Sequence, residues 1–154
     1  MTNLDNVTDF GHSEGIHQKL VEVDPGVFQG SRGPAFSVDI LAQFSITNVL
    51  SITSVTIPPV KGICRWWLCV DDGNEWTHQQ IDFVRNFCTF NQSKRNSVLI
   101  HCDHGSSRST GGMIIWQMID KNFTKEDAYS YIKSRNQFAN CREEILRSIP
   151  DIFS

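Results

Sequence analysis

The chain has 154 residues, of which 40% are hydrophobic and 20% are charged, a size and composition that fit one folded domain and exclude a disordered chain. Its formal net charge of −3 at pH 7 argues against broad binding to nucleic acid or to an anionic membrane, although a local basic patch stays compatible with it. No apolar run approaches the ~20 residues of a membrane span, and the N-terminus lacks the basic and apolar pattern of a secretory signal. We therefore expect an intracellular protein, in the cytoplasm or nucleus, whose five cysteines are free thiols.

The first residues of the chain predict a tail, a pair of strands and a short helix. Residues 1–15 are polar, so we expect a flexible tail ahead of one folded domain over residues 16–154. Residues 21–30 (VEVDPGVFQG) predict two short strands, because an Asp-Pro-Gly turn lies between apolar residues. The apolar spacing over residues 37–43 is consistent with a short helix.

Three later stretches predict strands. Residues 46–55 (ITNVLSITSV) are rich in β-branched residues, which is typical of a buried strand. Residues 64–70 (CRWWLCV) are another strand candidate, and an Asp-Asp-Gly turn follows them. Residues 97–101 (SVLIH) form the third apolar run.

Helices are predicted between and after these strands. Thr77 and Gln80 have the spacing of a capping box, which predicts a helix over residues 77–90. Residues 109–121 are mostly apolar and predict a buried helix. Thr124 is the expected N-cap of a further helix that runs to residue 134.

A last helix is expected after Asn140, with Asn140 as its N-cap and Glu143 at its third position. Strands that alternate with helices indicate an α/β fold. We therefore predict a single domain with a central, mostly parallel sheet flanked by helices.

The stretch VLIHCDHGSSRST, residues 98–110, joins a predicted strand to a predicted helix and indicates an anion site. A helix that begins near Arg108 offers unpaired N–H groups and its positive dipole end to the loop. A loop curled around that end aims successive N–H groups inward, which suits phosphate. Gly105 permits unusual backbone conformations, and Ser106 and Ser107 are small enough for a ligand to approach.

Cys102 is expected at the bottom of this cradle. The surrounding N–H groups and Arg108 favour its thiolate form at neutral pH, which can attack phosphorus. Arg108 offers a planar fork to two phosphate oxygens and stabilises the charge of the transition state. The hydroxyl of Ser109 is placed to steady the thiolate when it leaves again.

The same chemistry needs a proton donor for the departing alcohol or phenol. The predicted strand over residues 64–70 ends at Asp71 and Asp72. Because sites in α/β sheets form at the carboxyl ends of strands, one of these aspartates can protonate the leaving group and later deprotonate water. The competing interpretation is that both are ordinary turn residues.

These residues resemble the cysteine-based protein phosphatases. His101-Cys102-x5-Arg108-Ser109 matches the HCx5R(S/T) signature, and HCDHGSSRS is similar to the HCxxGxSRS loop of the dual-specificity subgroup. The resemblance covers most of the chain and implies the cysteine-phosphatase, dual-specificity phosphatase-like fold for the catalytic domain. Four further segments carry it: VFQGS (27–31), FSITNVLSIT (44–53), LCVDD (68–72) and DAYSYIKSR (127–135).

The resemblance also implies a role for each matching residue. Cys102 matches the nucleophile, and Arg108 matches the arginine that binds phosphate. Ser109 matches the hydroxyl that assists departure of the thiolate, while His101 matches a residue that orients the cysteine and is not a base. When LCVDD is laid on the family's IPvxD segment, Asp72 matches the general acid, and the neighbouring aspartate stays the alternative.

Two departures from the family pattern lie near the loop. Gly111 and Gly112 weaken the first helical turn, which either loosens the loop or lets another segment pack close. Leu68 and Cys69 replace the usual Ile-Pro before the acid. His101, Cys102 and His104 lack the spacing of a zinc site, so we expect no metal and no organic cofactor.

The substrate is expected to be a phosphorylated protein, not nucleic acid or a membrane. Loops that act on inositol phosphates often carry lysines, whereas the negative charge of Asp103 disfavours highly anionic substrates. Alternatives on the same loop are an RNA 5′-phosphatase, a phosphoinositide phosphatase, and a phosphate-binding module without turnover. The expected substrate-binding residues are Asp103, His104, Gly105, Ser106, Ser107 and Arg108.

Overall fold

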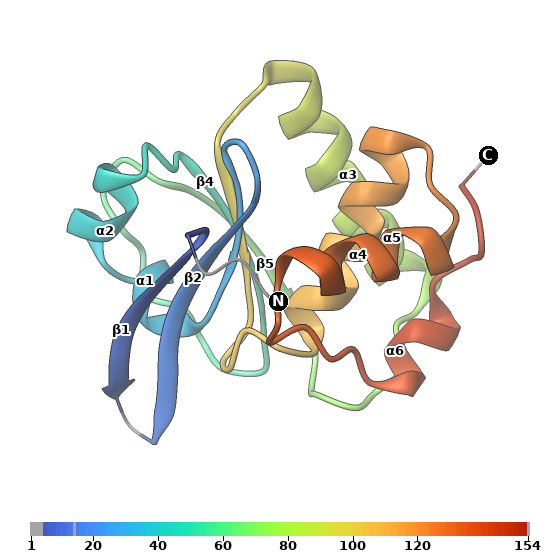
Figure 1. Cartoon of the computed structure of the whole chain (residues 1–154), viewed down its shortest axis with the longest axis horizontal. Helices are drawn as coiled ribbons and strands as arrows, with labels where there is room; N and C mark the ends of the chain where they lie inside the picture. The colour runs from blue at the N-terminus through green and yellow to red at the C-terminus, as the bar shows by residue number, and fades with distance from the viewer. Residues whose placement is uncertain (1–4, 14, 154) are drawn as a thin grey trace.

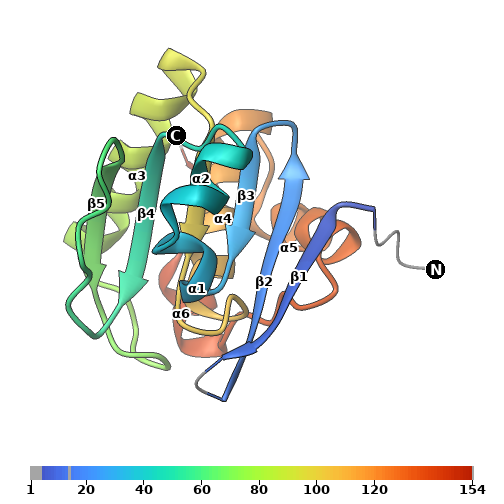
Figure 2. The same cartoon turned by 90° about the vertical axis from the view of Figure 1, so that its left-hand side faces the viewer.

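The computed structural model describes residues 5–13 and 15–153, and this part of the chain contains one six-stranded sheet. The spatial order of the strands is β1-β2-β3-β6-β4-β5 (Figures 1 and 2). Four neighbouring strands, β3, β6, β4 and β5, are parallel, and β1 and β2 extend the sheet in antiparallel pairs. This confirms the predicted mostly parallel sheet. The strands are β1 (Val7–Ser13), β2 (Ile16–Asp24), β3 (Val27–Gly30), β4 (Asn48–Thr53), β5 (Cys64–Cys69) and β6 (Val98–His101).

Helices cover both faces of the sheet, as predicted. Figure 1 views the sheet nearly edge-on, with α1 and α2 on one side and α3 to α6 on the other, and Figure 2 shows α1 and α2 in front of the strands. Side chains alternate between the two faces: Val49 and Leu99 pack toward α1 and α2, while Leu50 and Ile100 pack toward the other helices. The helices are α1 (Arg32–Ala35), α2 (Val38–Gln43), α3 (His78–Lys94), α4 (Arg108–Lys121), α5 (Lys125–Arg135) and α6 (Glu143–Ser148).

The N-terminal segment differs from the prediction. Residues 1–15 were expected to form a flexible tail, but Val7–Ser13 forms β1 and pairs with β2. Residues 9–13 are exposed. This edge strand therefore lacks the alternation of apolar and polar residues from which a strand is predicted. Backbone hydrogen bonding to β2, not burial of side chains, defines the strand.

Helix starts were predicted well where a side chain caps the helix. The Thr77 side chain accepts a hydrogen bond from the Gln80 backbone in a complete capping box, and Thr124 caps α5. The prediction that Asn140 caps the last helix is wrong. Helix α6 begins at Glu143 after Arg142, because the backbone N–H of Asn140 donates to the carbonyl of Ser106 and holds this segment against the loop before α4.

The two glycines of α4 allow close packing. A Cβ atom at Gly111 would lie 2.8 Å from Ile145 and from Trp76, and one at Gly112 would lie 2.9 Å from Ile100 and Ile52. Helix α4 can therefore lie directly on the sheet and against α6. Of the two expectations for these glycines, the structure shows the close approach of other segments.

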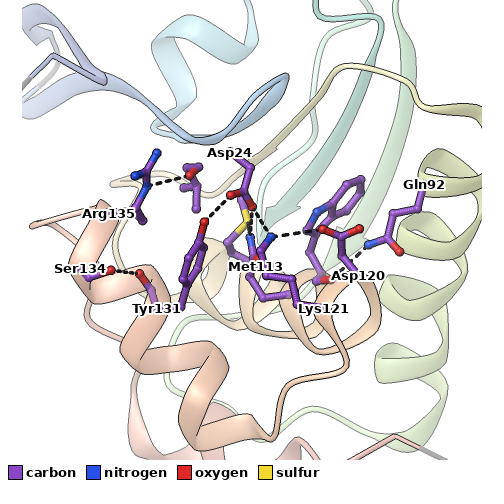
Figure 3. A network of polar contacts seen from close by, with 11 residues as sticks. Asp24, Gln92, Met113, Asp120, Lys121, Tyr131, Ser134 and Arg135 are labelled. Carbon is purple, nitrogen blue, oxygen red and sulfur yellow. Dashed lines mark hydrogen bonds and ion pairs between the residues drawn. The ribbon is translucent and has the colours of Figure 1, made fainter.

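A partly buried ionic cluster holds α4 and α5 to the β2–β3 turn, as Figure 3 shows. Asp24 accepts hydrogen bonds from Lys121 Nζ and Gln117 Nε2, each at 2.8 Å, and from the hydroxyl of Tyr131. Burial disfavours the charged carboxylate, but these donors outweigh that effect and lower the pKa of Asp24. Because α4 begins at Arg108, this anchor at its far end helps to fix the helix that carries the loop.

Among residues 5–13 and 15–153, no helix is both long enough and apolar enough to cross a membrane.

Candidate active site

The loop between β6 and α4 borders a cavity of about 470 Å³. The loop follows the carboxyl end of β6, where Gly30 of β3 and Ser51 of β4 lie beside His101 in the parallel register. The cavity therefore lies at the edge of the sheet where sites in α/β folds form. Its lining residues are Asp72, Cys102, His104, Ser106, Ser107, Arg108, Asn140 and Arg142.

Cys102 lies at the start of the loop, with 2% of its surface exposed. Gly105 lets the loop turn tightly, since its φ is +75° and a Cβ atom there would lie 2.8 Å from the carbonyl carbon of Gly30. The backbone N–H of Arg32 donates to the carbonyl of Asp103 at 3.2 Å. The loop is thus fixed against the end of β3 from two points.

Arg108 is buried at the first position of α4, and two of its nitrogens are already engaged. One terminal nitrogen donates to the carbonyl of Val70 at 3.0 Å, and the other donates to Asp103 Oδ2 at 3.1 Å. Within the described residues, Arg108 Nε and Asp103 Oδ1 are buried without a hydrogen-bond partner. Arg108 therefore lines the cavity with its charge partly compensated by Asp103.

The expected substrate-binding residues divide into two groups. His104, Ser106, Ser107 and Arg108 line the cavity, whereas Asp103 and Gly105 do not. The carboxylate of Asp103 turns toward Arg108, and Gly105 packs on β3.

Ser109 belongs to a buried polar cluster that the sequence did not reveal. Gln29 of β3 donates from Nε2 to the hydroxyls of Ser109 and Thr110, at 2.9 and 2.8 Å. Asn136 in turn donates to the carbonyl oxygen of the Gln29 side chain at 2.9 Å. Because the Ser109 oxygen accepts from Gln29, its own hydrogen stays available to another acceptor.

The two candidate acids lie in different surroundings. Asp72 lines the cavity together with Cys102, and its Oδ2 accepts a hydrogen bond from Arg142 Nε at 2.9 Å. Asp71 instead lines a separate depression with Glu75. Asp72 therefore shares a cavity with Cys102, and Asp71 does not line that cavity.

His101 is fully buried behind the loop. Its Nε2 lies 2.6 Å from Ser51 Oγ, and its Nδ1 lies 3.1 Å from the carbonyl oxygen of Cys102. Burial, opposed by the bond to the Cys102 carbonyl, lowers the pKa of His101 to about 3. The ring is therefore neutral at physiological pH and held in place by contacts on both nitrogens.

The side chain of Lys19, in β2, places a cation at the loop. The neighbouring residues in the sequence form no motif that predicts this position. Its Nζ donates to the carbonyl of His104 at 2.5 Å and lies 4.6 Å from the centre of the Phe138 ring. Burial lowers the pKa of Lys19, and a thiolate at Cys102 opposes that shift. Arg142 was also missed, since only the folded chain brings Asn140 and Arg142 to the cavity.

Comparisons with known proteins identify the family of the chain. The family model described as "Dual specificity phosphatase, catalytic domain" matches residues 27–152. The chain is 28% identical over 130 residues to dual specificity protein phosphatase MPK-4 of Drosophila melanogaster, which covers 81% of this chain and 34% of that protein. It is 28% identical over 148 residues to human dual specificity protein phosphatase 5, covering 85% of this chain and 38% of the relative.

Among solved structures, the fold is similar to that of the human tyrosine phosphatase-like serine/threonine/tyrosine-interacting protein. The TM-score is 0.75 at 20% identity, with 84% of this chain and 90% of the other covered. The chain spans little more than a third of the length of the two curated relatives. The family match covers most of the chain, and the chain therefore belongs to the dual specificity phosphatase catalytic-domain family.

Proposed function

We propose that the chain is a protein phosphatase that hydrolyses phosphotyrosine as well as phosphoserine and phosphothreonine through a cysteinyl-phosphate. The observation that carries the proposal is a single cavity lined by Cys102, Arg108 and Asp72. These side chains supply a nucleophile, an anion binder and a proton donor, which are the groups that the reaction needs. Family membership supports the same activity.

In the first step, the Cys102 thiolate attacks phosphorus and a sulfur–phosphorus bond forms. The bond from phosphorus to the substrate oxygen breaks, and protonated Asp72 gives its proton to that oxygen, so that a neutral alcohol or phenol leaves. Arg108 holds the phosphoryl oxygens, for which its contacts with Val70 and Asp103 must adjust. The loop N–H groups and the start of α4 stabilise the negative charge that develops.

In the second step, water attacks the phosphorus of the cysteinyl-phosphate. Asp72, now ionised, takes a proton from that water, and the sulfur–phosphorus bond breaks. Inorganic phosphate leaves and the Cys102 thiolate is restored. The hydroxyl of Ser109, which accepts from Gln29, keeps its hydrogen to donate to the departing sulfur.

A phosphate-binding module without turnover is the second candidate function. One observation favours it: a structure of similar fold carries the name of a phosphatase-like interacting protein, so the fold alone does not distinguish an enzyme from a binder. The presence of Asp72 on the same cavity as Cys102 favours the enzyme, because a binder has no use for an acid beside the phosphate.

Phosphate release from matched phosphotyrosine and phosphothreonine peptides tests the proposal. We expect turnover of both peptides and its loss in Cys102→Ser, which keeps the shape of the loop but removes the thiolate. The absence of turnover in a folded wild-type protein that still binds both peptides would support the binding module instead. If the folded protein neither binds nor cleaves the peptides, RNA 5′-phosphates and phosphoinositides are the next substrates to test.

A further inference from the structure

Three neighbouring strands bring polar side chains together behind the cavity. Ser51 of β4 is directly opposite His101 of β6 in the parallel register. On the other side of β4, Ser51 is paired with Trp67 of β5, two residues from Arg65. Since residues two apart share a face of a sheet, Arg65, Ser51 and His101 all lie on the face covered by α1 and α2.

These side chains form a continuous chain of hydrogen bonds that ends at the Cys102 backbone. Arg65 donates from one terminal nitrogen to Ser51 Oγ at 2.8 Å, and Ser51 Oγ lies 2.6 Å from His101 Nε2. His101 Nδ1 lies 3.1 Å from the carbonyl oxygen of Cys102. The other terminal nitrogen of Arg65 donates to the carbonyl of Ala35 at 2.8 Å, which fixes the guanidinium in place.

The direction of every bond follows from the two ends of the chain. An arginine has donors only, so Ser51 Oγ accepts from Arg65 and keeps its hydrogen and a second lone pair for His101 Nε2. A carbonyl has acceptors only, so His101 Nδ1 must carry the hydrogen that points at Cys102. A neutral imidazole has one ring hydrogen, so with that hydrogen on Nδ1 the Nε2 atom is an acceptor, and the Ser51 hydroxyl donates to it.

We propose that Arg65 is a positioning residue of the active site, which acts through Ser51 to fix the His101 tautomer that holds the Cys102 carbonyl. Because the peptide group is planar and trans, a fixed Cys102 carbonyl also fixes the following N–H of Asp103, which points the opposite way. The chain of hydrogen bonds therefore sets the orientation of the first peptide group in the loop between β6 and α4. It also places a positive charge at the far end of a polarised chain, which favours the thiolate over the thiol at Cys102.

Arg65 occupies a position in which a cation is disfavoured unless its contacts compensate. The side chain is half-buried, and desolvation lowers the pKa of its guanidinium. In the described part of the chain, its Nε is buried without a hydrogen-bond partner. The Phe36 ring lies 5.7 Å from the Arg65 guanidinium and packs edge-on against His101, so one aromatic ring contacts two members of the hydrogen-bond chain.

The test uses the free protein without substrate. Ring ¹⁵N shifts of His101 report which nitrogen carries the hydrogen, and the spectrum of His101→Gln assigns the signal among the five histidines. The rate of Cys102 alkylation by iodoacetamide, followed against pH, reports the thiolate. In Arg65→Met we expect a population of the Nε2–H tautomer and an alkylation curve displaced by about one pH unit upward, which is about ten-fold slower alkylation on its acidic side.

Conservative variants separate the proposed role from general structural damage. Arg65→Lys keeps a cationic donor and Ser51→Thr keeps the hydroxyl, so both are expected to retain most of the wild-type tautomer and alkylation rate. Ser51→Ala breaks the chain but leaves the Arg65 bond to Ala35, and it decides the question if Arg65→Met fails to fold. The proposal is overturned if a folded Arg65→Met or Ser51→Ala protein shows the wild-type tautomer and the wild-type alkylation curve.

The importance of these hydrogen bonds for turnover rests on the proposed phosphatase function. The proposed function and the proposed role of Arg65 can nevertheless be disproved separately. A wild-type protein that releases no phosphate would defeat the phosphatase reaction and leave the tautomer measurement readable. An unchanged tautomer in a protein that does release phosphate would defeat only the role of Arg65. If both hold, Arg65→Met lowers phosphate release about as much as it lowers the alkylation rate at the same pH.

Discussion

Arg142 donates a hydrogen bond from Nε to Oδ2 of Asp72 at 2.9 Å on the lining of the cavity that also contains Cys102. The backbone N–H of Arg142 donates to Ser107 Oγ at 3.1 Å, so the same residue contacts both the loop between β6 and α4 and the candidate acid. The Arg142 side chain is exposed, and an exposed ion pair contributes little to stability. Its main effect is therefore on where Asp72 lies.

This pair predicts that Arg142→Gln slows phosphate release without changing the thermal midpoint noticeably. Release of an alcohol needs a well-placed acid more than release of an acidic phenol does. We expect the loss to be several-fold for a phosphothreonine peptide and smaller for p-nitrophenyl phosphate. Arg142→Lys, which keeps the charge, is the matched control. Equal rates for wild type and Arg142→Gln on the phosphothreonine peptide would rule out this positioning role.

The two neighbouring aspartates predict opposite outcomes. Asp72→Asn should lower phosphate release from a phosphothreonine peptide by about 10²- to 10⁴-fold, the usual contribution of a general acid. Asp71→Asn should have little effect, because Asp71 lies on a separate depression. Steady-state rates of both variants on the same peptide, with circular dichroism to verify folding, check this. A large loss in Asp71→Asn and none in Asp72→Asn would reverse the assignment.

Replacing Lys19 tests how its positive charge affects the loop. Lys19→Met keeps the length of the side chain but removes the buried cation and its hydrogen bond to the His104 carbonyl. We expect a few-fold slower alkylation of Cys102 by iodoacetamide at pH 6 and a similar loss of phosphate release, because a nearby positive charge favours the thiolate. Lys19→Arg is the control that retains the charge. Alkylation of Lys19→Met at the wild-type rate would contradict this role.

Gly111 predicts a steric penalty that outweighs helix propensity. In an exposed helix, alanine stabilises by about 1 kcal/mol relative to glycine. At Gly111, however, the added Cβ atom would lie 2.8 Å from Ile145 and Trp76, and overpacking costs about 1–3 kcal/mol. Urea unfolding should therefore show a lower free energy of unfolding for Gly111→Ala. A Gly111→Ala protein more stable than wild type would contradict the close packing.

The sequence predicted those parts of the molecule that depend on neighbouring residues. The spacing from Cys102 to Arg108 lies within one loop, and the Thr77 capping box lies within one helical turn, so both are readable without the fold. Arg65 and Lys19 reach the site from other strands, and their contacts depend on sheet register, which one sequence does not disclose. The wrong N-cap at Asn140 has the same origin, because a long-range bond to Ser106 decides where α6 begins.

His101 predicts how stability changes with pH. Its pKa in the folded protein is lowered to about 3 from an ordinary value of 6.5, so between these values the unfolded chain binds a proton that the folded protein does not. Stability therefore falls as the pH drops from 6.5 toward 3, with a slope from this residue of up to about 1.4 kcal/mol per pH unit. Urea unfolding of wild type and of His101→Gln at pH 7, 6 and 5 isolates this effect, since the variant lacks the titrating group. The free energy of unfolding should decrease more steeply with falling pH in wild type, and parallel curves would show that His101 is not held neutral by burial.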